Sequence, residues 1–268
     1  MTNDIAAPGE KPKLDTSVPH SARIWNYWLG GKDNFQVDRE VGDQISAVMP
    51  DMVPTARAIR GFLQRVVTYL AGEAGIRQFL DIGTGLPTAD NTHEVAQRVA
   101  PDSRIVYVDN DPLVLTHARA LLTSSREGAC DYLDADVHDP ETILREASRT
   151  LDFSQPVGLM LLAIVHFILD DAESYAVVKR LLDALPSGSY MALVHAVHSP
   201  STDEAIRKWN EVGTPKMCAR SEEEIRHFFD GLELLEPGIV PVPLWRPPAG
   251  AVTTDPAAGG LCGVGRKP

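Results

Sequence analysis

The stretch Phe79-Leu80-Asp81-Ile82-Gly83-Thr84-Gly85-Leu86-Pro87 decides the fold of this chain. A short apolar run leads into Asp81, and two glycines follow where a buried parallel strand would turn into a helix. Because Gly83 and Gly85 have no Cβ, their backbone can adopt positive φ and let a ligand lie against the main chain. The helix after them would offer its N-terminal amides to the same ligand. The stretch therefore predicts a nucleotide-binding turn.

A second apolar run, Ile105-Val106-Tyr107-Val108-Asp109, also ends in a carboxylate. In a doubly wound sheet this strand lies beside the first, so Asp109 would emerge where the two hydroxyls of a ribose bind. A lone G-x-G is weak evidence, since many unrelated loops contain it. The combination of strand, G-x-G, helix and strand-ending aspartate is much stronger evidence for a doubly wound α/β fold.

The bulk composition limits the classes of partner. The chain has 268 residues, 44% of them hydrophobic, which is enough for one large α/β domain with a core. Its formal net charge of -12 opposes binding to a phosphate backbone, because nucleic-acid affinity comes largely from lysine and arginine. We therefore expect no nucleic-acid partner.

Neither a signal peptide nor a membrane span is expected. The N-terminus has no apolar core, and the most apolar stretch, Val157 to Leu169, is too short to cross a bilayer. Cys130, Cys218 and Cys262 are far apart and lack C-x-x-C spacing, so we expect reduced, mostly buried thiols. These features predict a cytoplasmic protein with no membrane partner, and they leave the oligomeric state open.

The chain divides into three expected parts. Residues 1–18 are rich in proline, lysine, aspartate and small residues and should form a disordered tail. Residues 19–72 should form an N-terminal helical lid or extension. Residues 73–268 should form the nucleotide-binding domain.

Aromatic residues are concentrated between His20 and Phe35, although only 6% of the chain is aromatic. Ile24, Trp28 and Leu29 recur at helical spacing. Gly30-Gly31 would end this helix. Periodicity alone favours an amphipathic helix that packs its aromatic side chains on the core. The alternative is that the helix and its glycine-containing loop fold over a ligand pocket, where the glycines allow close backbone approach.

The other elements follow from periodicity and turn residues. Helices are expected over two patterns between Asp38 and Gly72, and over Thr88–Val99, Pro112–Leu122, Glu141–Thr150, Asp171–Leu185 and Ser221–Phe229. Further strands are expected over Ala129–Val137, Val157–Val165, Tyr190–His195, Leu232–Glu236 and Gly260–Gly265. The last two strands are joined without a helix and should pair antiparallel. The expected fold is a doubly wound, Rossmann-like, seven-stranded sheet, mostly parallel with an antiparallel last strand, plus an N-terminal helical extension.

Together these residues resemble a class I S-adenosylmethionine-dependent methyltransferase. The turn Asp81–Gly85, the ribose-type Asp109 and the post-strand Asp136 are similar to that fold's successive cofactor motifs. More narrowly, Ser21–Phe35 and the segment Leu162–Phe167 are similar to an actinobacterial family of S-adenosyl methyltransferases once catalogued only as a domain of unknown function. The resemblance implies S-adenosyl-L-methionine as cofactor and methyl transfer (EC 2.1.1.-) as activity.

The resemblance also implies how the cofactor is held. Asp81 would bind its ammonium, Asp109 both ribose hydroxyls and Asp136 the adenine amine. The full set of implied cofactor-binding residues is Tyr27, Gly30, Asp81, Gly83, Thr84, Gly85, Asp109, Asn110, Asp136, Val137 and Ala163. One departure is Pro87, which stands at the third position of the usual G-x-G-x-G and lacks an amide, so the ligand would rely more on Gly83 and Thr84.

Methyl transfer from a sulfonium needs a general base only if the nucleophile carries a proton. His166 follows the central strand at the edge where ligands of open α/β sheets bind, and it is the best candidate. A core histidine or a cofactor contact is an equally good interpretation of His166, and His195 and His198 are weaker candidates. No cluster has metal-ligand spacing, since Asp170-Asp171 is more simply a helix cap, so no metal is expected.

Three functions fit the sequence. The first is methyl transfer to a small molecule, since no Asn-Pro-Pro-aromatic motif or Pro-Cys nucleophile supports methylation of nucleic-acid bases. The second is a non-catalytic S-adenosylmethionine-binding protein, which a single sequence leaves open. The third is an NAD(P)-dependent oxidoreductase, but its third glycine would fall at Thr88 and its sheet would not end in an antiparallel pair. The sequence does not name the methyl acceptor.

Overall fold

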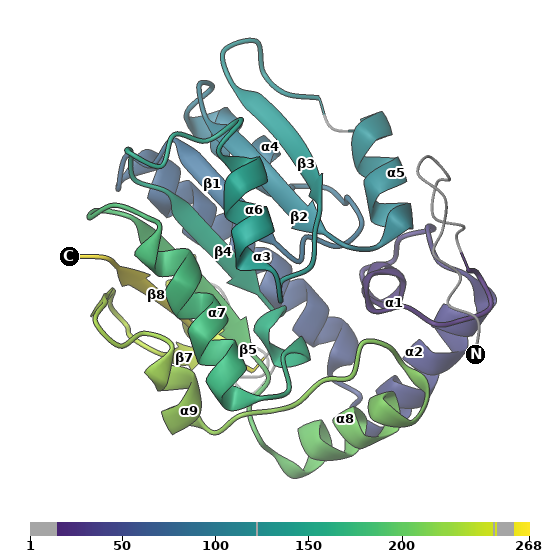
Figure 1. The fold of residues 1–268 in the computed structure, drawn as a ribbon. Helices are drawn as coiled ribbons and strands as arrows, with labels where there is room; N and C mark the ends of the chain where they lie inside the picture. Colours follow the sequence, from purple (N-terminus) through teal and green to yellow (C-terminus); the bar gives the residue numbers. More distant parts are fainter. Residues whose placement is uncertain (1–14, 122, 249, 251–259) are drawn as a thin grey trace, which may run out of the picture.

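The computed structural model describes residues 15–121, 123–248, 250 and 260–268. Residues 1–14 of the expected disordered tail, and Leu122 at the end of an expected helix, lie outside this part of the chain. The described residues form one twisted sheet with helices on both faces (Figure 1). Its strands are β1 (Gln78–Ile82), β2 (Arg104–Asp109), β3 (Ala129–Asp134), β4 (Gly158–Leu162), β5 (Tyr190–His195), β6 (Glu233–Leu234), β7 (Val240–Pro241) and β8 (Leu261–Arg266).

The strand order confirms the expected doubly wound topology. The order is β3-β2-β1-β4-β5-β8-β6, and the first five strands along the chain pair in parallel. β8 runs antiparallel to β5, β6 and β7, so the antiparallel end of the sheet is confirmed. The described sheet has one strand more than expected, because β6 and β7 are two separate two-residue strands that pair with different residues of β8.

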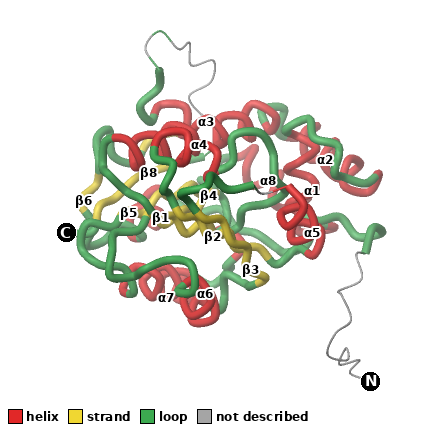
Figure 2. Tube along the Cα trace, turned by 90° about the horizontal axis from the view of Figure 1, so that it is seen from above, coloured by secondary structure: helices red, strands yellow, loops and turns green. Residues whose placement is uncertain are grey.

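Two helical layers cover the sheet, as Figure 2 shows from above. Leu80 and Ile82 on β1 join a core cluster with apolar residues of α6 and α7, whereas Phe79 joins a second cluster with α3 and α4. This alternation is the two-residue period of a strand that is buried on both faces. The helices are α1 (Ser21–Trp28), α2 (Gln36–Val48), α3 (Met52–Gly72), α4 (Thr92–Val99), α5 (Pro112–Leu121), α6 (Pro140–Ala147), α7 (Asp171–Asp183), α8 (Pro200–Val212) and α9 (Glu222–His227), with short 3-10 turns η1 (Val165–Phe167) and η2 (Val242–Leu244).

A helical cap, formed by α1, α2, the first turns of α3 and α8, has its own apolar cluster (Figure 1). Ile24, Ile45 and Trp209 are members of this cluster. The expected extension, residues 19–72, supplies most of the cap, but the second half of α3 packs on the sheet. α8 was not expected from the sequence. Ser199 begins it by accepting a hydrogen bond from the Thr202 amide, with proline in its first turn.

Several elements are shorter than expected, and three of them differ at the carboxyl edge of the sheet. α4 begins at Thr92 rather than Thr88, because Asn91 accepts a hydrogen bond from the Thr88 amide and its own amide donates to Glu94. β3 ends at Asp134 rather than residue 137, and β4 ends at Leu162 rather than residue 165. The residues after these strand ends are therefore in loops, where they can line a site.

Candidate active site at the carboxyl edge of the sheet

A cavity of about 540 Å³ lies between the carboxyl ends of the parallel strands and the helical cap. This is where open α/β sheets bind their ligands. Ten of the residues predicted to be functional line it: Asp81, Gly83, Thr84, Gly85, Asp109, Asn110, Asp136, Val137, Ala163 and His166. The fold thus brings together residues from four separate strand ends.

The glycine turn needs both of its glycines. Gly83 has a φ of 76°, and a Cβ at this position would lie 2.6 Å from the Ile164 side chain. Gly85 has a φ of 65°, and a Cβ there would meet no atom within 4 Å. Gly83 therefore lets the turn pack against the loop after β4, while Gly85 leaves open space beside the main chain.

Asp81 is a buried carboxylate at the base of the cavity. It is 5% exposed, and its Oδ2 accepts a hydrogen bond of 2.6 Å from the Thr92 hydroxyl. Burial raises the pKa of Asp81 to about 6, although the Thr92 hydroxyl and Arg60 oppose the rise. A cationic group placed beside this side chain would stabilise its ionised form.

Asp109 is held in place by two backbone amides. Its Oδ2 accepts from Gly85 N at 2.8 Å, and its Oδ1 accepts from Asp111 N at 3.0 Å. Burial raises the pKa of Asp109, while the two amides oppose the rise. A carboxylate has about four acceptor positions, so both oxygens can accept further hydrogen bonds, as a pair of ribose hydroxyls requires.

The loop after β3 places a third acidic group, Asp136, at the cavity wall. Asp136 accepts from the Asn110 side-chain amide at 3.1 Å and from the His138 amide at 2.9 Å. Val137, which lies between Asp136 and His138 in the chain, is buried and lines the cavity. This polar rim beside an apolar wall suits a flat heteroaromatic group with an exocyclic amine.

His166 lies in η1, three residues after the strained residue Ala163, which has a φ of 63° although it is not glycine. The His166 side chain is buried and lines the cavity, and its Nδ1 has no hydrogen-bond partner among the described residues. Burial, with smaller contributions from His195 and Arg220, holds the pKa of His166 well below its usual range. The imidazole is therefore neutral near pH 7 and retains an acceptor nitrogen.

The two weaker histidine candidates lie outside the cavity lining. His195 is fully buried, and its ring nitrogens contact Ala196 O at 2.8 Å and Arg220 at 2.8 Å. Burial lowers the pKa of His195 to about 4. His198 pairs with Asp203 at 2.8 Å on the surface. Both side chains have structural partners, so His166 is the one of the three candidate histidines that lines the cavity.

Helix α1 lines the cavity through Ile24, Trp25 and Trp28. Tyr27 and Gly30, which were predicted to bind the cofactor, are not among the lining residues. The Tyr27 hydroxyl donates to Asp43 at 2.7 Å, and Gly30 is exposed beyond the helix end. The rotation of the helix thus turns its tryptophans, rather than Tyr27, toward the site.

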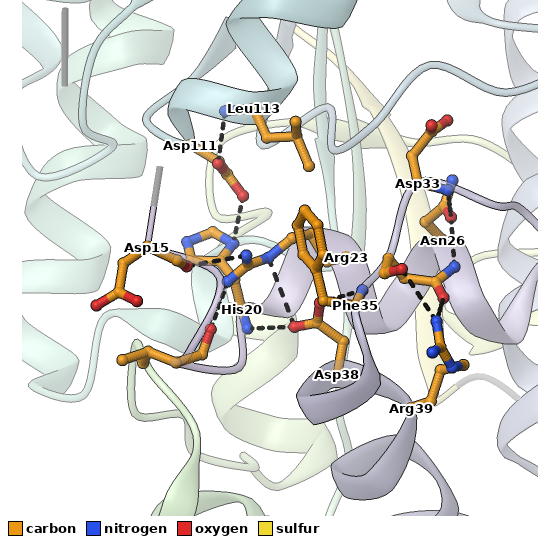
Figure 3. Close-up of polar contacts among 12 residues, drawn as sticks. Asp15, His20, Arg23, Asn26, Asp33, Phe35, Asp38, Arg39, Asp111 and Leu113 are labelled. Atoms are coloured by element: carbon orange, nitrogen blue, oxygen red, sulfur yellow. Dashed lines mark hydrogen bonds and ion pairs between the residues drawn. The ribbon is translucent and has the colours of Figure 1, made fainter. Parts of the chain in front are cut away.

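Polar contacts join the start of α1 to α2 and to the loop after β2, as Figure 3 shows. His20 Nδ1 lies 2.8 Å from Asp111 Oδ2, which joins the start of α1 to the loop that follows Asp109. On its other side, buried Asp38 accepts from the His20 amide at 3.0 Å and lies 3.5 Å from Arg23 Nε. The cap is therefore coupled to the residue expected to bind the ribose.

Arg60 is a lining residue that the sequence analysis missed. Its guanidinium donates to Thr88 and, at 2.7 Å, to Asn91, while its buried Nε has no partner among the described residues. Burial lowers the pKa of Arg60, and Asp81 opposes this effect. The available signal was an arginine between Ile59 and Leu63 on the apolar face of α3. Arg60 is also the one lysine or arginine among the described residues that line the cavity.

No group of three or more histidine, cysteine or acidic residues in the described ranges could hold a metal ion. None of the helices within those ranges is both long and apolar enough to cross a membrane. The three cysteines are unpaired thiols; Cys262 is buried and the other two are half-buried.

Comparisons with known proteins agree with this geometry. A crystal structure of a DUF574 family protein from Streptomyces avermitilis MA-4680 is 46% identical, with a TM-score of 0.90 over 96% of this chain and 100% of that one. A crystal structure from Thermobifida fusca YX, provisionally named a methyltransferase, is 43% identical, with a TM-score of 0.88 over 97% of this chain and 99% of that one.

A more distant structure shares the fold. The N-methyltransferase NodS from Bradyrhizobium japonicum WM9, in complex with S-adenosyl-L-homocysteine, is 14% identical with a TM-score of 0.51 over 92% of this chain and 99% of that one. A search of curated proteins found no match. The model of one protein family, described as S-adenosyl methyltransferase, matches residues 8–268. This chain therefore belongs to the S-adenosyl methyltransferase family.

Proposed function

We propose that the protein transfers a methyl group from S-adenosylmethionine to a small-molecule acceptor. The observation that carries the proposal is that one cavity combines the glycine turn, Asp109 and His166 with an apolar cap. Its volume of about 540 Å³ lies within the ~300–1,000 Å³ usual for small-molecule sites. The negative charge of the chain, -12, supports an acceptor other than nucleic acid.

The charges of the lining fit this cofactor. S-adenosylmethionine carries a sulfonium and an ammonium, whereas NAD(P) carries a pyrophosphate. The cavity is lined by Asp51, Asp81, Asp109 and Asp136, against the single cation Arg60 in the described lining. This balance favours a cationic ligand and weighs against an oxidoreductase that binds NAD(P).

Each part of the cofactor has a matching group. Asp109 would accept from the ribose hydroxyls, and Asp81 would pair with the ammonium. The unpartnered Nε of Arg60 supports pairing of this side chain with the carboxylate of the cofactor's methionine part. The Gly83–Gly85 turn would cover the methionine part of the cofactor. The adenine would lie against the rim formed by Asp136, Asn110 and Val137. Tyr27 and Gly30 lie outside the lining and are not part of this proposal.

The chain's own residues would then orient the acceptor and take its proton. When bound, S-adenosylmethionine supplies a methyl group that is already activated by the sulfonium. His166 would accept a hydrogen bond, and then the proton, from the acceptor nucleophile through its unpartnered Nδ1, which lies in the lining of the cavity. The cap would exclude water and hold the acceptor in line with the methyl group.

Calorimetric titration of the full chain with S-adenosylhomocysteine and with NAD would test the cofactor. We expect saturable binding of S-adenosylhomocysteine and no binding of NAD. Binding of NAD without binding of S-adenosylhomocysteine would instead favour an oxidoreductase. Transfer would be tested with methyl-labelled S-adenosylmethionine and a small-molecule extract. Binding without a labelled product across extracts would favour the non-catalytic alternative.

A further inference from the structure

The cap side of the cavity carries a set of apolar side chains that we call the acceptor chamber. They come from α1, α2, the link between α2 and α3, α3, α8 and the segment after α8. The members are Ile24, Trp25, Trp28, Ile45, Met49, Met52, Ile59, Leu63, Ala205, Ile206, Trp209 and Met217.

Several members of the chamber keep solvent-accessible surface. Trp25, Met49, Ile206 and Met217 are only half-buried, although each lines the cavity beneath the cap. Uncovered apolar surface is unfavourable in water. A ligand with an apolar body would bury this surface and gain the corresponding free energy.

Two of the three indole groups of the chamber have N–H groups that already donate to backbone carbonyls. Trp209 Nε1 donates to Pro215 O at 2.7 Å, and Trp28 Nε1 donates to Gly42 O at 3.3 Å. Trp25 packs edge-on against Trp28 with centroids 5.8 Å apart. Because these N–H groups already have partners, the rings and the nearby methionine sulfurs favour contact with another aromatic ring.

The chamber offers no counter-ion for an acidic ligand. Arg60, the cation of the described lining, donates to Thr88 and Asn91 on the sheet side and lies in the field of Asp81. The other charged cap residue in the lining is Asp51. An uncharged acceptor therefore fits this chamber better than an anionic one.

The chamber also lies next to His166. Met217, a chamber member, precedes Cys218, whose backbone amide donates to His166 O at 2.8 Å. His166 lines the same cavity with an unpartnered, buried Nδ1. A ligand seated in the chamber thus has a neutral proton acceptor at the sheet side of the cavity.

We infer that the methyl acceptor is an uncharged aromatic compound with a hydroxyl group, whose ring occupies the acceptor chamber and whose hydroxyl faces His166. This inference rests on the proposed function. In the transfer, the acceptor's O–H bond breaks and its proton goes to the His166 imidazole, while the oxygen forms a bond to the methyl carbon. The methyl–sulfur bond breaks, and its electron pair stays on sulfur, so that a neutral thioether leaves.

The test is calorimetric binding of 2-naphthol to the full chain saturated with S-adenosylhomocysteine. Naphthalene-2-sulfonate, which has the same rings and a fixed negative charge, is the matched probe. We expect 2-naphthol to bind at least about tenfold more tightly than the sulfonate, the effect of leaving one charge without a partner. Ile206→Asn should weaken 2-naphthol binding by about tenfold or more, because it places a polar group in the chamber.

Val212→Asn is the matched control, since Val212 is on the same helix, is 48% exposed and is not among the lining residues. It should leave 2-naphthol binding unchanged. Equal binding of the two probes, no binding of 2-naphthol, or equal affinities in both variants would overturn the inference. The two-probe comparison needs no variant to fold. The S-adenosylhomocysteine titration that precedes it tests the proposed function separately.

Discussion

Asp81→Asn should stabilise the ligand-free protein while it weakens cofactor binding. The carboxylate is buried, and the substitution keeps an oxygen that can accept the 2.6 Å hydrogen bond from Thr92. The substitution removes the negative charge that the buried Asp81 carboxylate carries when it is ionised. Stability and affinity should therefore change in opposite directions.

The size of the stability effect follows from the pKa of Asp81. Burial raises this pKa from 3.8 to about 6 in the folded protein. At ~1.4 kcal/mol per pH unit, ionised Asp81 costs the folded state about 3 kcal/mol at pH 8. Because the folded pKa is raised, the cost is absent below about pH 4, where both states are protonated, grows between about pH 4 and 6, and is nearly complete above pH 6. The two amide donors of asparagine need partners, so we expect a net gain of about 1–2 kcal/mol at pH 8.

Urea denaturation of both proteins at pH 8 and near pH 4.5 measures this effect. The variant should be more stable at pH 8, and its advantage should shrink toward pH 4.5. A variant that is equally or less stable at both pH values would refute the reasoning from a buried charge. In the same variant, S-adenosylhomocysteine should bind at least about tenfold more weakly, since a charge-assisted hydrogen bond is lost. Unchanged affinity would mean that Asp81 does not hold the ammonium.

Four further predictions concern the cavity. Asp109→Ala should weaken S-adenosylhomocysteine binding by about 1.5–3 kcal/mol in a calorimetric titration; an unchanged dissociation constant in a folded variant would place the ribose elsewhere. His166→Gln should lower turnover on an aromatic acceptor by roughly 10²-fold or more and leave cofactor affinity nearly intact, whereas equal losses would make it a cofactor contact. Arg60→Met should weaken binding of S-adenosylhomocysteine by about tenfold or more but not of 5′-methylthioadenosine, which has no carboxylate; matched losses would argue against carboxylate pairing. Limited proteolysis near Gly30-Gly31 should slow when S-adenosylhomocysteine is added, because α1 lines the cavity, and a cutting rate that ignores the ligand would make α1 a packing element.

The parts of the fold that depend on local chemistry could be predicted from the sequence. Gly83, Gly85 and Asp109 mark strand ends because each position has a local requirement: positive φ at the glycines, and a carboxylate at the end of a buried strand. The strand–turn–helix pattern therefore carried both the topology and the position of the cavity. The precise ends of the helices could not be predicted, because capping residues such as Asn91 compete with helix propensity.

The helical cap was harder to predict because its contacts are long-range. α8 buries only Ala205 and Trp209, so its apolar stripe is weak, and the main local signal is Ser199 before a proline. Arg60 meets Thr88, 28 positions along the chain, only in the folded state. Periodicity also does not determine how α1 is rotated over the site. For this reason the sequence did not show that Trp25, rather than Tyr27, lines the cavity.

A crystal structure of the full chain with S-adenosylhomocysteine tests the central claim most directly. We expect the adenosine between Asp109 and Asp136, with both ribose hydroxyls about 2.6–3.2 Å from the Asp109 carboxylate oxygens. The sulfur should face the opening between the glycine turn and the acceptor chamber. A ligand bound elsewhere, or in this cavity without contact to Asp109, would contradict the account.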